Sequence, residues 1–215
     1  MGRAAPNGVA GNGDRVVNAD TARLEAFSDG VFAIAITLLI LEIKVPTSGS
    51  GMLATRLLRQ WPAYFSFLAS FAFIGIMWIN HHRMFTHIRR CDDLLLVFNL
   101  LLLMGITFVP FPTAVLAASL GGPDQRTAAV LFQATYLMIS LLFNLLWRYA
   151  ASNHRRLLSP DTDASSVRRI TRQYSFGPLL YLVCLALAWV NVLASLLVNL
   201  SLACFFAFPA NRNKQ

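Results

Sequence analysis

The residues best suited to chemistry in this 215-residue chain lie near the start of its first apolar segment. Asp29 stands within about one helical turn of a run of Val, Ala, Ile, Thr and Leu that continues to Glu42. A carboxylate so close to the hydrocarbon of a membrane is costly, and it usually binds a protein partner or faces a cavity. Asp29 therefore predicts either a structural ion pair or a group on an ion pathway.

Three histidines form a second polar group, at the end of another apolar segment: His81, His82 and His87. Membrane di-iron oxygenases use clusters of histidines as metal ligands. This chain has only four histidines, with His154 in a different loop, and no carboxylates are suitably placed beside them. We therefore expect no metal site and no enzyme activity from this cluster.

A third feature is an apolar stripe on the helix that contains Asp29. At about 100° per residue, Ile34, Leu38 and Leu41 fall within about 60° of one another. Thr37 borders the stripe, whereas Asp29 points nearly the opposite way. Such a stripe suits packing or lipid contact as well as a pore, so the spacing alone leaves these interpretations open.

The composition indicates the environment of these residues. Hydrophobic residues make up 56% of the chain and charged residues only 13%, whereas a soluble domain is about one quarter charged. The net charge of +8 is spread over short patches between long apolar runs. This pattern is typical of a membrane protein and excludes a continuous nucleic-acid-binding face.

The apolar runs predict an all-α integral membrane protein of six transmembrane helices, since a span needs about 20 apolar residues. The expected spans cover residues 26–45, 61–79, 94–118 and 127–147, with two short helices within 176–209 that break near 189–191. Asp20 or Thr21 is expected to cap the first helix, and Pro110 and Pro112 to kink the third.

The basic residues predict the orientation of these spans. With six spans, 14 of the 18 Lys and Arg residues lie on the side that holds both termini. The positive-inside rule makes that side cytoplasmic, in a cell (inner) membrane. We expect a flexible cytoplasmic tail over 1–19, a six-helix transmembrane domain over 20–210 and a cytoplasmic C-terminal tail over 211–215. The basic loop between the fourth and fifth spans also has the composition to attract anionic lipid headgroups.

One motif resembles a known family. It reads Arg-x-x-x-Phe-Ser-Asp-Gly and comprises Arg23, Phe27, Ser28, Asp29 and Gly30, ahead of the Ile/Thr/Leu helix. A Trp-x-x-His-His sequence, Trp78 with His81 and His82, ends the second helix. With the six-span length, these features resemble a bacterial member of the transmembrane-protein-175 potassium channel family, whose animal relatives lie in endosomes and lysosomes.

The resemblance implies a homotetramer in which the first helices surround a central pore for potassium ions, without a cofactor. It implies selectivity by rings of apolar side chains, here Ile34, Leu38 and Leu41 with Thr37 alongside. The chain has no Thr-Val-Gly-Tyr-Gly filter of the ordinary potassium-channel kind. Glu42 stands at the outer end of this helix, either to attract cations or to pair with Lys44 or Arg59.

We interpret Asp29 as part of a structural network, because the helical wheel turns it away from the stripe. The same network is expected to include the rest of the motif and the Trp-x-x-His-His residues, so that the first helix is tied to its neighbours. Gly30 is expected to let a neighbouring backbone approach closely. The alternative is a secondary transporter in which Asp29 is the coupling site, although no internal repeat is visible.

Overall fold

The computed structural model of the chain describes residues 12–46, 52–152 and 157–207, with side chains over 20–46, 52–152 and 157–202. Apart from one isolated β-bridge, these residues form only helices and connections, as predicted. The elements are α1 (Asn12–Leu38), the 3₁₀-helix η1 (Leu39–Glu42), α2 (Leu53–Arg59), α3 (Trp61–Phe85), α4 (Asp93–Phe108), α5 (Pro110–Ser119), α6 (Gln125–Ala150), α7 (Ala164–Val190) and α8 (Val192–Ala207).

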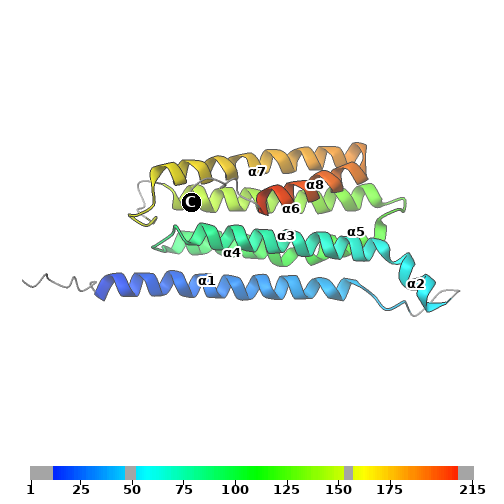
Figure 1. Cartoon of the computed structure of the whole chain (residues 1–215), viewed down its shortest axis with the longest axis horizontal. Coiled ribbons are helices and arrows are strands. Elements are labelled where there is room, and N and C mark those ends of the chain that lie inside the picture. The colour runs from blue at the N-terminus through cyan, green and yellow to red at the C-terminus, as the bar shows by residue number, and fades with distance from the viewer. Residues whose placement is uncertain (1–11, 47–51, 153–156, 208–215) are drawn as a thin grey trace, which may run out of the picture.

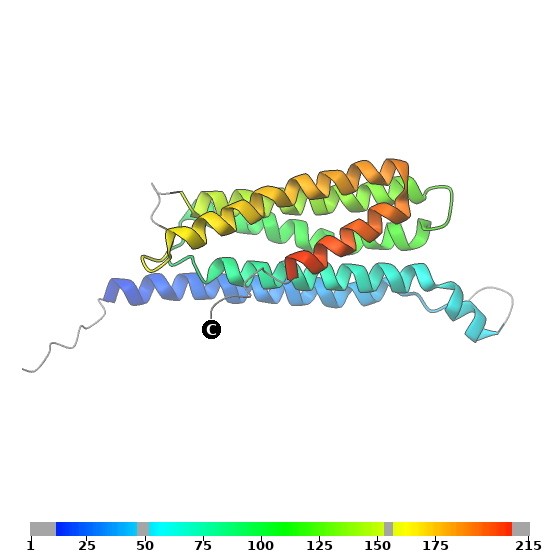
Figure 2. The same ribbon diagram turned by 45° about the horizontal axis from the view of Figure 1, so that its top comes forward.

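The long helices lie along one common axis (Figures 1 and 2). Helix α1 forms one edge of the bundle and α7 the opposite edge, with α3, α4 and α6 between them. Helix α8 turns back from the end of α7 and packs against α7 and α3. The first helix is therefore peripheral within a single subunit, with one face toward α3 and α4 and the other uncovered.

Five helical segments of the described chain are long and apolar enough to cross a membrane, counting α1 with η1 and α4 with α5. The predicted break falls at Asn191, and beyond it Val192–Leu202 forms a shorter apolar helix. At 1.5 Å per residue, the 16 residues of α8 extend about 24 Å, less than a hydrocarbon core of about 30 Å. Six crossings therefore remain a prediction.

Helix α1 begins at Asn12, well before the start that the sequence suggested. Part of the segment expected to be a flexible tail is therefore helical, while residues 1–11 and the tail over 211–215 lie outside the described residues. Thr21 does not cap the helix but donates a hydrogen bond to the carbonyl of Arg89, at 3.0 Å. A capping residue stabilises a helix end only modestly, so a helix extends past a potential cap where packing stabilises the additional turns.

Prolines interrupt the bundle in two different ways. Helix α4 ends before Pro110, which has no N–H for the carbonyl of Ile106, and Val109 donates to that oxygen instead, at 3.2 Å. The expected kink is thus a break between α4 and α5. Pro178 lies inside α7, where the side-chain amide of Asn144 donates to the freed carbonyl of Tyr174 at 2.7 Å, so the helix continues.

Helix α7 also begins earlier than predicted, at Ala164. Asp163 caps it by accepting a hydrogen bond from the backbone of Ser165 at 2.8 Å. Hydrogen bonds from the Ser165 hydroxyl and then from the Ser165 backbone lower the pKa of Asp163 to about 2. Arg168 and Arg172 therefore lie on a helix and not in a loop, which corrects the sequence-based expectation for part of the basic loop.

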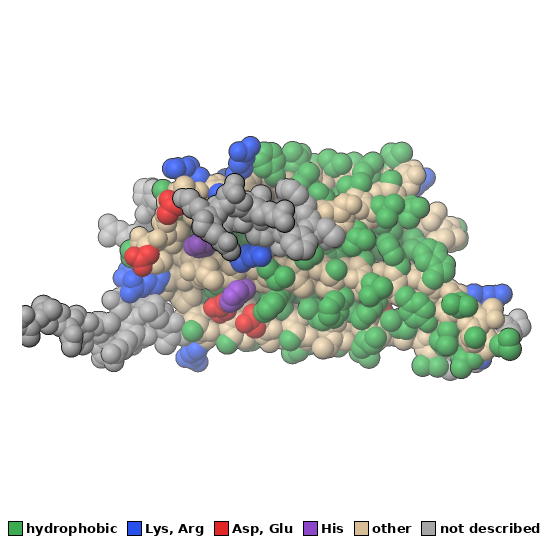
Figure 3. Space-filling view, in the orientation of Figure 1, with side chains coloured by type: hydrophobic (Ala, Val, Ile, Leu, Met, Phe, Trp, Pro, Cys, Tyr) green, Lys and Arg blue, Asp and Glu red, His purple; other side chains and the backbone are tan. Residues whose placement is uncertain are grey.

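The surface of the bundle divides along its length. Hydrophobic side chains cover the middle of the face shown in Figure 3, and most acidic, basic and histidine side chains gather at the end where α1 and α7 begin. The core is built around α6, where Phe132, Tyr136 and Trp147 are fully buried. This division fits a bundle that crosses a membrane with a basic end at one interface.

Candidate functional site

The face of α1 that is turned away from the core carries the predicted stripe. Ile34, Leu38 and Leu41 are 59%, 40% and 60% exposed in the subunit. Leu41 stands in the tighter 3₁₀ turn of η1 and still faces outward. Thr37 is exposed beside them, and its hydroxyl donates to the carbonyl of Ile34 at 2.9 Å. The outward stripe therefore presents apolar side chains and one hydroxyl oxygen.

The opposite face of α1 is fixed in the core. Phe32, Ala35 and Leu39 are almost completely buried, and Ile36 is partly buried against the same cluster. Because these residues alternate with the stripe at helical spacing, a rotation of α1 about its axis would expose them. The packing therefore fixes which side chains α1 presents outward.

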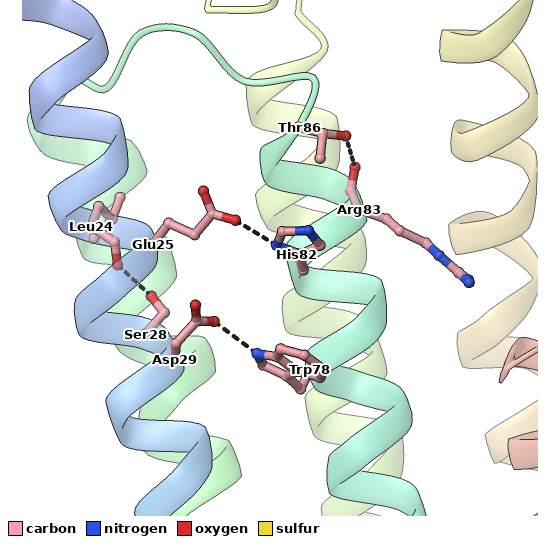
Figure 4. A network of polar contacts seen from close by, with 8 residues as sticks. All are labelled: Leu24, Glu25, Ser28, Asp29, Trp78, His82, Arg83 and Thr86. Carbon is pink, nitrogen blue, oxygen red and sulfur yellow. Dashed lines mark hydrogen bonds and ion pairs between the residues drawn. The ribbon is translucent and has the colours of Figure 1, made fainter.

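Two polar contacts join α1 to α3 near the basic end of the bundle (Figure 4). The indole Nε1 of Trp78 donates to Oδ1 of Asp29 at 2.8 Å. One turn further toward the end, Nδ1 of His82 lies 2.7 Å from Oε1 of Glu25, an ion pair whenever the imidazole is protonated. The Trp78 and His82 rings stack, with their centroids 6.2 Å apart. Asp29 therefore faces α3, on the side away from the exposed stripe.

A second chain of hydrogen bonds lies deeper and joins α1, α3 and α4. The Ser28 hydroxyl donates to the carbonyl of Leu24 at 2.8 Å, so it accepts the bond from the Asn99 amide, at 3.0 Å. The Asn99 side-chain carbonyl oxygen then accepts a hydrogen bond from Nε2–H of His81, at 2.9 Å. Ser28, Asn99 and His81 are all fully buried. The three helices are thus tied by one buried polar chain.

Not every predicted member of the network takes part. Arg23 is exposed and makes no hydrogen bond or ion pair with the residues that the structure describes. Phe27 is 54% exposed. A Cβ added to Gly30 would meet nothing within 4 Å, so this glycine permits no close approach inside the subunit. These three motif residues lie on surface that the subunit itself leaves open.

Two other sequence-based expectations concern the ends of the bundle. Glu42 forms no ion pair within the described part of the chain, so pairing with Lys44 or Arg59 is not seen. His87 lies apart from His81 and His82, in the connection after α3, beside Trp147. Burial, and to a lesser degree Arg169, lowers the pKa of His87. Over the described residues, no three metal-ligating side chains converge.

Sequence reasoning missed two members of the α1 contacts. Asn99 was not singled out, although an asparagine inside the apolar run of α4 is a signal in itself, because a polar group in hydrocarbon needs a partner. The contact of Glu25 was not predicted either, because a cap at Asp20 or Thr21 places Glu25 in the first turn of the helix. Because α1 begins at Asn12, Glu25 lies in the helix interior and faces α3.

Comparison with known proteins identifies this arrangement. A family profile described as "Endosomal/lysosomal potassium channel TMEM175" matches residues 23–110. A protein named as a potassium channel from Chamaesiphon minutus is 50% identical over 198 residues, which cover 89% of this chain and 96% of that protein. Another from Streptomyces collinus is 41% identical over 191 residues, 88% of this chain and 92% of that protein.

A solved structure gives the same result for the fold. The crystal structure of a lysosomal potassium-selective channel TMEM175 homolog from Chamaesiphon minutus superposes with a TM-score of 0.79 at 48% identity, over 88% of this chain and 97% of that one. These relatives are named as potassium channels and not as enzymes, and their names do not favour the secondary-transporter alternative. The chain therefore belongs to the TMEM175 family of channels, as the motif at Asp29 predicted.

Proposed function

We propose that this chain is a potassium-permeable channel in which α1 from each of four copies surrounds a central pore. The observation that carries the proposal is the apolar stripe of α1. The subunit leaves this stripe exposed, whereas the opposite face of α1 packs in the core. The names of the relatives from Chamaesiphon minutus and Streptomyces collinus support potassium as the permeating ion.

In this proposal, Ile34, Leu38 and Leu41 form successive hydrophobic rings, and Thr37 contributes an oxygen between them. Such rings offer no polar atoms to replace the water around a cation, so passage depends on how easily the ion sheds or compresses its hydration. Potassium is larger and more weakly hydrated than sodium, and the barrier therefore favours it.

The polar contacts of α1 have a positioning role in the same proposal. The Asp29–Trp78 and Glu25–His82 contacts and the buried chain through Ser28, all on the side away from the stripe, fix the rotation of α1 about its axis. Arg23, Phe27 and Gly30, which the subunit leaves open, are then available to neighbouring copies. The intramembrane carboxylate is thus a structural group and not a coupling site.

The proposed assembly has its own tests. Native mass spectrometry in mild detergent is expected to show four chains, and a stable monomer or trimer would remove the basis for a pore. The proposed topology, in a cell membrane with both termini cytoplasmic, follows from the distribution of Lys and Arg. A cysteine placed at Asn213 is then expected to resist membrane-impermeant labelling from outside intact cells, and strong labelling there would contradict six spans.

The pore assignment is tested by two matched alanine variants, Ile34→Ala and Ile36→Ala, in planar bilayers with potassium on one side and sodium on the other. Ile34→Ala widens a ring, so its reversal potential is expected to move toward zero. Ile36 is partly buried on the other side of the helix, so Ile36→Ala is expected to keep the wild-type reversal potential. The opposite pattern would show that another face of α1 lines the pore.

A further inference from the structure

Far from the proposed pore, basic side chains gather where the last turn of α6 meets the first turns of α7. Arg148, Arg168 and Arg172 are all exposed there. Figure 3 shows Lys and Arg side chains at this end of α7, next to hydrophobic side chains that cover the rest of its visible face. A charged cluster at the border of an apolar surface marks the level of a membrane interface.

Arg148 is held in place without a carboxylate. Its Nε donates to Oδ1 of Asn144 at 2.7 Å and its Nη2 to the Ser175 hydroxyl at 2.9 Å. Ser175 in turn donates to the carbonyl of Thr171 at 2.7 Å, which fixes its lone pairs toward the guanidinium. The seam between α6 and α7 therefore orients this guanidinium, and its remaining N–H groups stay available.

Arg172 adds a second guanidinium on the same face. It precedes Ser175 by three residues, and side chains at that spacing on a helix are about 5–6 Å apart at Cβ. Its Cζ lies 5.8 Å from the centroid of the Phe176 ring. Neither Arg148 nor Arg172 forms an ion pair with a described carboxylate, so their charges are left for an anion from outside the subunit.

Apolar side chains continue from this pair toward the middle of the bundle. Leu145 and Leu141 on α6 are 44% and 51% exposed, and Leu179 and Leu182 on α7 are 55% and 50% exposed. The order along the surface is therefore two guanidinium groups and then a leucine-lined seam. An anionic phospholipid has the same order, with a phosphate at the interface and acyl chains below it.

The position of the seam decides its partner. Helix α7 lies at the edge of the bundle opposite α1 (Figures 1 and 2). If the four copies of α1 surround the central axis, α7 and the exposed side of α6 next to it face lipid, and in this respect the inference rests on the proposed function. We propose that Arg148 and Arg172 bind the phosphate of an anionic phospholipid, with an acyl chain along Leu145 and Leu179 and with Ser175 and Asn144 as positioning residues.

Native mass spectrometry of the full-length channel tests this, with phosphatidylglycerol and phosphatidylcholine of the same acyl chains added in turn. The wild type is expected to bind phosphatidylglycerol at least tenfold more tightly, and Arg148→Gln/Arg172→Gln is expected to lose that preference. The control, Arg59→Gln/Arg126→Gln, removes two exposed arginines at the other end of the bundle and is expected to retain it. An equal loss in both double variants, or no preference in the wild type, would overturn the proposal.

The single variant Arg148→Lys separates a built site from diffuse charge. Lysine keeps the charge but cannot bond to Asn144 and Ser175 in a planar fork while it contacts phosphate, so we expect weaker phosphatidylglycerol binding. Wild-type binding by this variant would refute the site, as would displacement of the lipid by an equal concentration of inorganic phosphate. The same spectra report the number of chains, and bilayer recordings report conductance, so a failure of the pore proposal is distinguishable from a failure of the lipid site.

Discussion

Replacing Asn99 by leucine would remove the residue that joins α1, α3 and α4 in the buried polar chain. Asn99 accepts from His81 at 2.9 Å and donates to Ser28 at 3.0 Å, and all three are fully buried. A neutral imidazole carries one N–H in either tautomer, and Nδ1 of His81 already has no partner among the described residues. A tautomer change therefore cannot relieve the loss, and Asn99→Leu leaves a buried donor unpaired.

The magnitude follows from two bounds. An unpaired buried donor costs about 1–3 kcal/mol in soluble proteins. Hydrogen bonds between membrane helices average about 0.6 kcal/mol and reach about 1.7, because the unfolded state within the membrane also finds partners. We expect Asn99→Leu to lower the free energy of unfolding by about 1–2 kcal/mol, between these bounds.

A double-mutant cycle with His81→Phe isolates the interaction. The His81 ring stacks on Phe85, with centroids 4.4 Å apart, and lies 5.4 Å from Phe32, so a phenyl ring fits the same place. The double variant removes donor and acceptor together, and it is expected to be about 1 kcal/mol more stable than the sum of the single effects.

The assay is equilibrium unfolding in mixed micelles, followed by circular dichroism, for the wild type, both single variants and the double variant. The control cycle pairs Asn99→Leu with His82→Phe, because His82 contacts Glu25 and not Asn99. Effects in that cycle are expected to add within about 0.5 kcal/mol. Additive effects for Asn99 and His81, or the same coupling in both cycles, would refute the bond pattern assigned to the buried chain.

Three further predictions use the same unfolding assay. Trp78→Phe removes the donor to Asp29 and is expected to lower the free energy of unfolding by about 1 kcal/mol, whereas adding Asp29→Asn to that variant should cost little more. Burial and Arg169 lower the pKa of His87 in the folded chain. Below the ordinary histidine pKa of about 6.5, the unfolded chain therefore binds more protons than the folded chain. Stability is therefore expected to fall as the pH drops below that value, and less steeply in His87→Gln. Gly121 has φ of 84°, so Gly121→Ala is expected to lower the unfolding free energy by about 1 kcal/mol.

The sequence predicted the orientation of α1 better than its contacts. Helical spacing placed Asp29 opposite the apolar stripe and suggested a partner at the end of α3, where Trp78 is found. The Glu25–His82 contact was not predicted, because a cap at Asp20 would place Glu25 in the first turn. Caps are local preferences of about 1 kcal/mol, and they do not determine a helix start that tertiary packing sets elsewhere.

The early start of α7 shows a different limit of the sequence. Apolar runs report only the part of a helix that lies in hydrocarbon, so the polar turns before Phe176 looked like a loop. Asp163, followed by Ala-Ser-Ser-Val, was the available signal for a helix start. That difference matters for the proposed lipid site, because Arg172 stands in a fixed relation to α6 only if it belongs to a helix.

Several polar side chains inside these helices are bonded to other protein groups, and this bears on what the proposed pore can offer an ion. Asn144 bonds to the carbonyl that Pro178 leaves free, and Asn99 joins three helices. Thr37 is the one polar side chain bordering the outward stripe of Ile34, Leu38 and Leu41, and its hydroxyl donates a hydrogen bond to the carbonyl of Ile34. Only its oxygen lone pairs remain to face outward, and a lone pair attracts a cation where a hydroxyl hydrogen would repel it. In the proposed tetramer, a ring of four such oxygens between apolar rings would therefore favour cations over anions, while leaving the choice between potassium and sodium to the apolar rings.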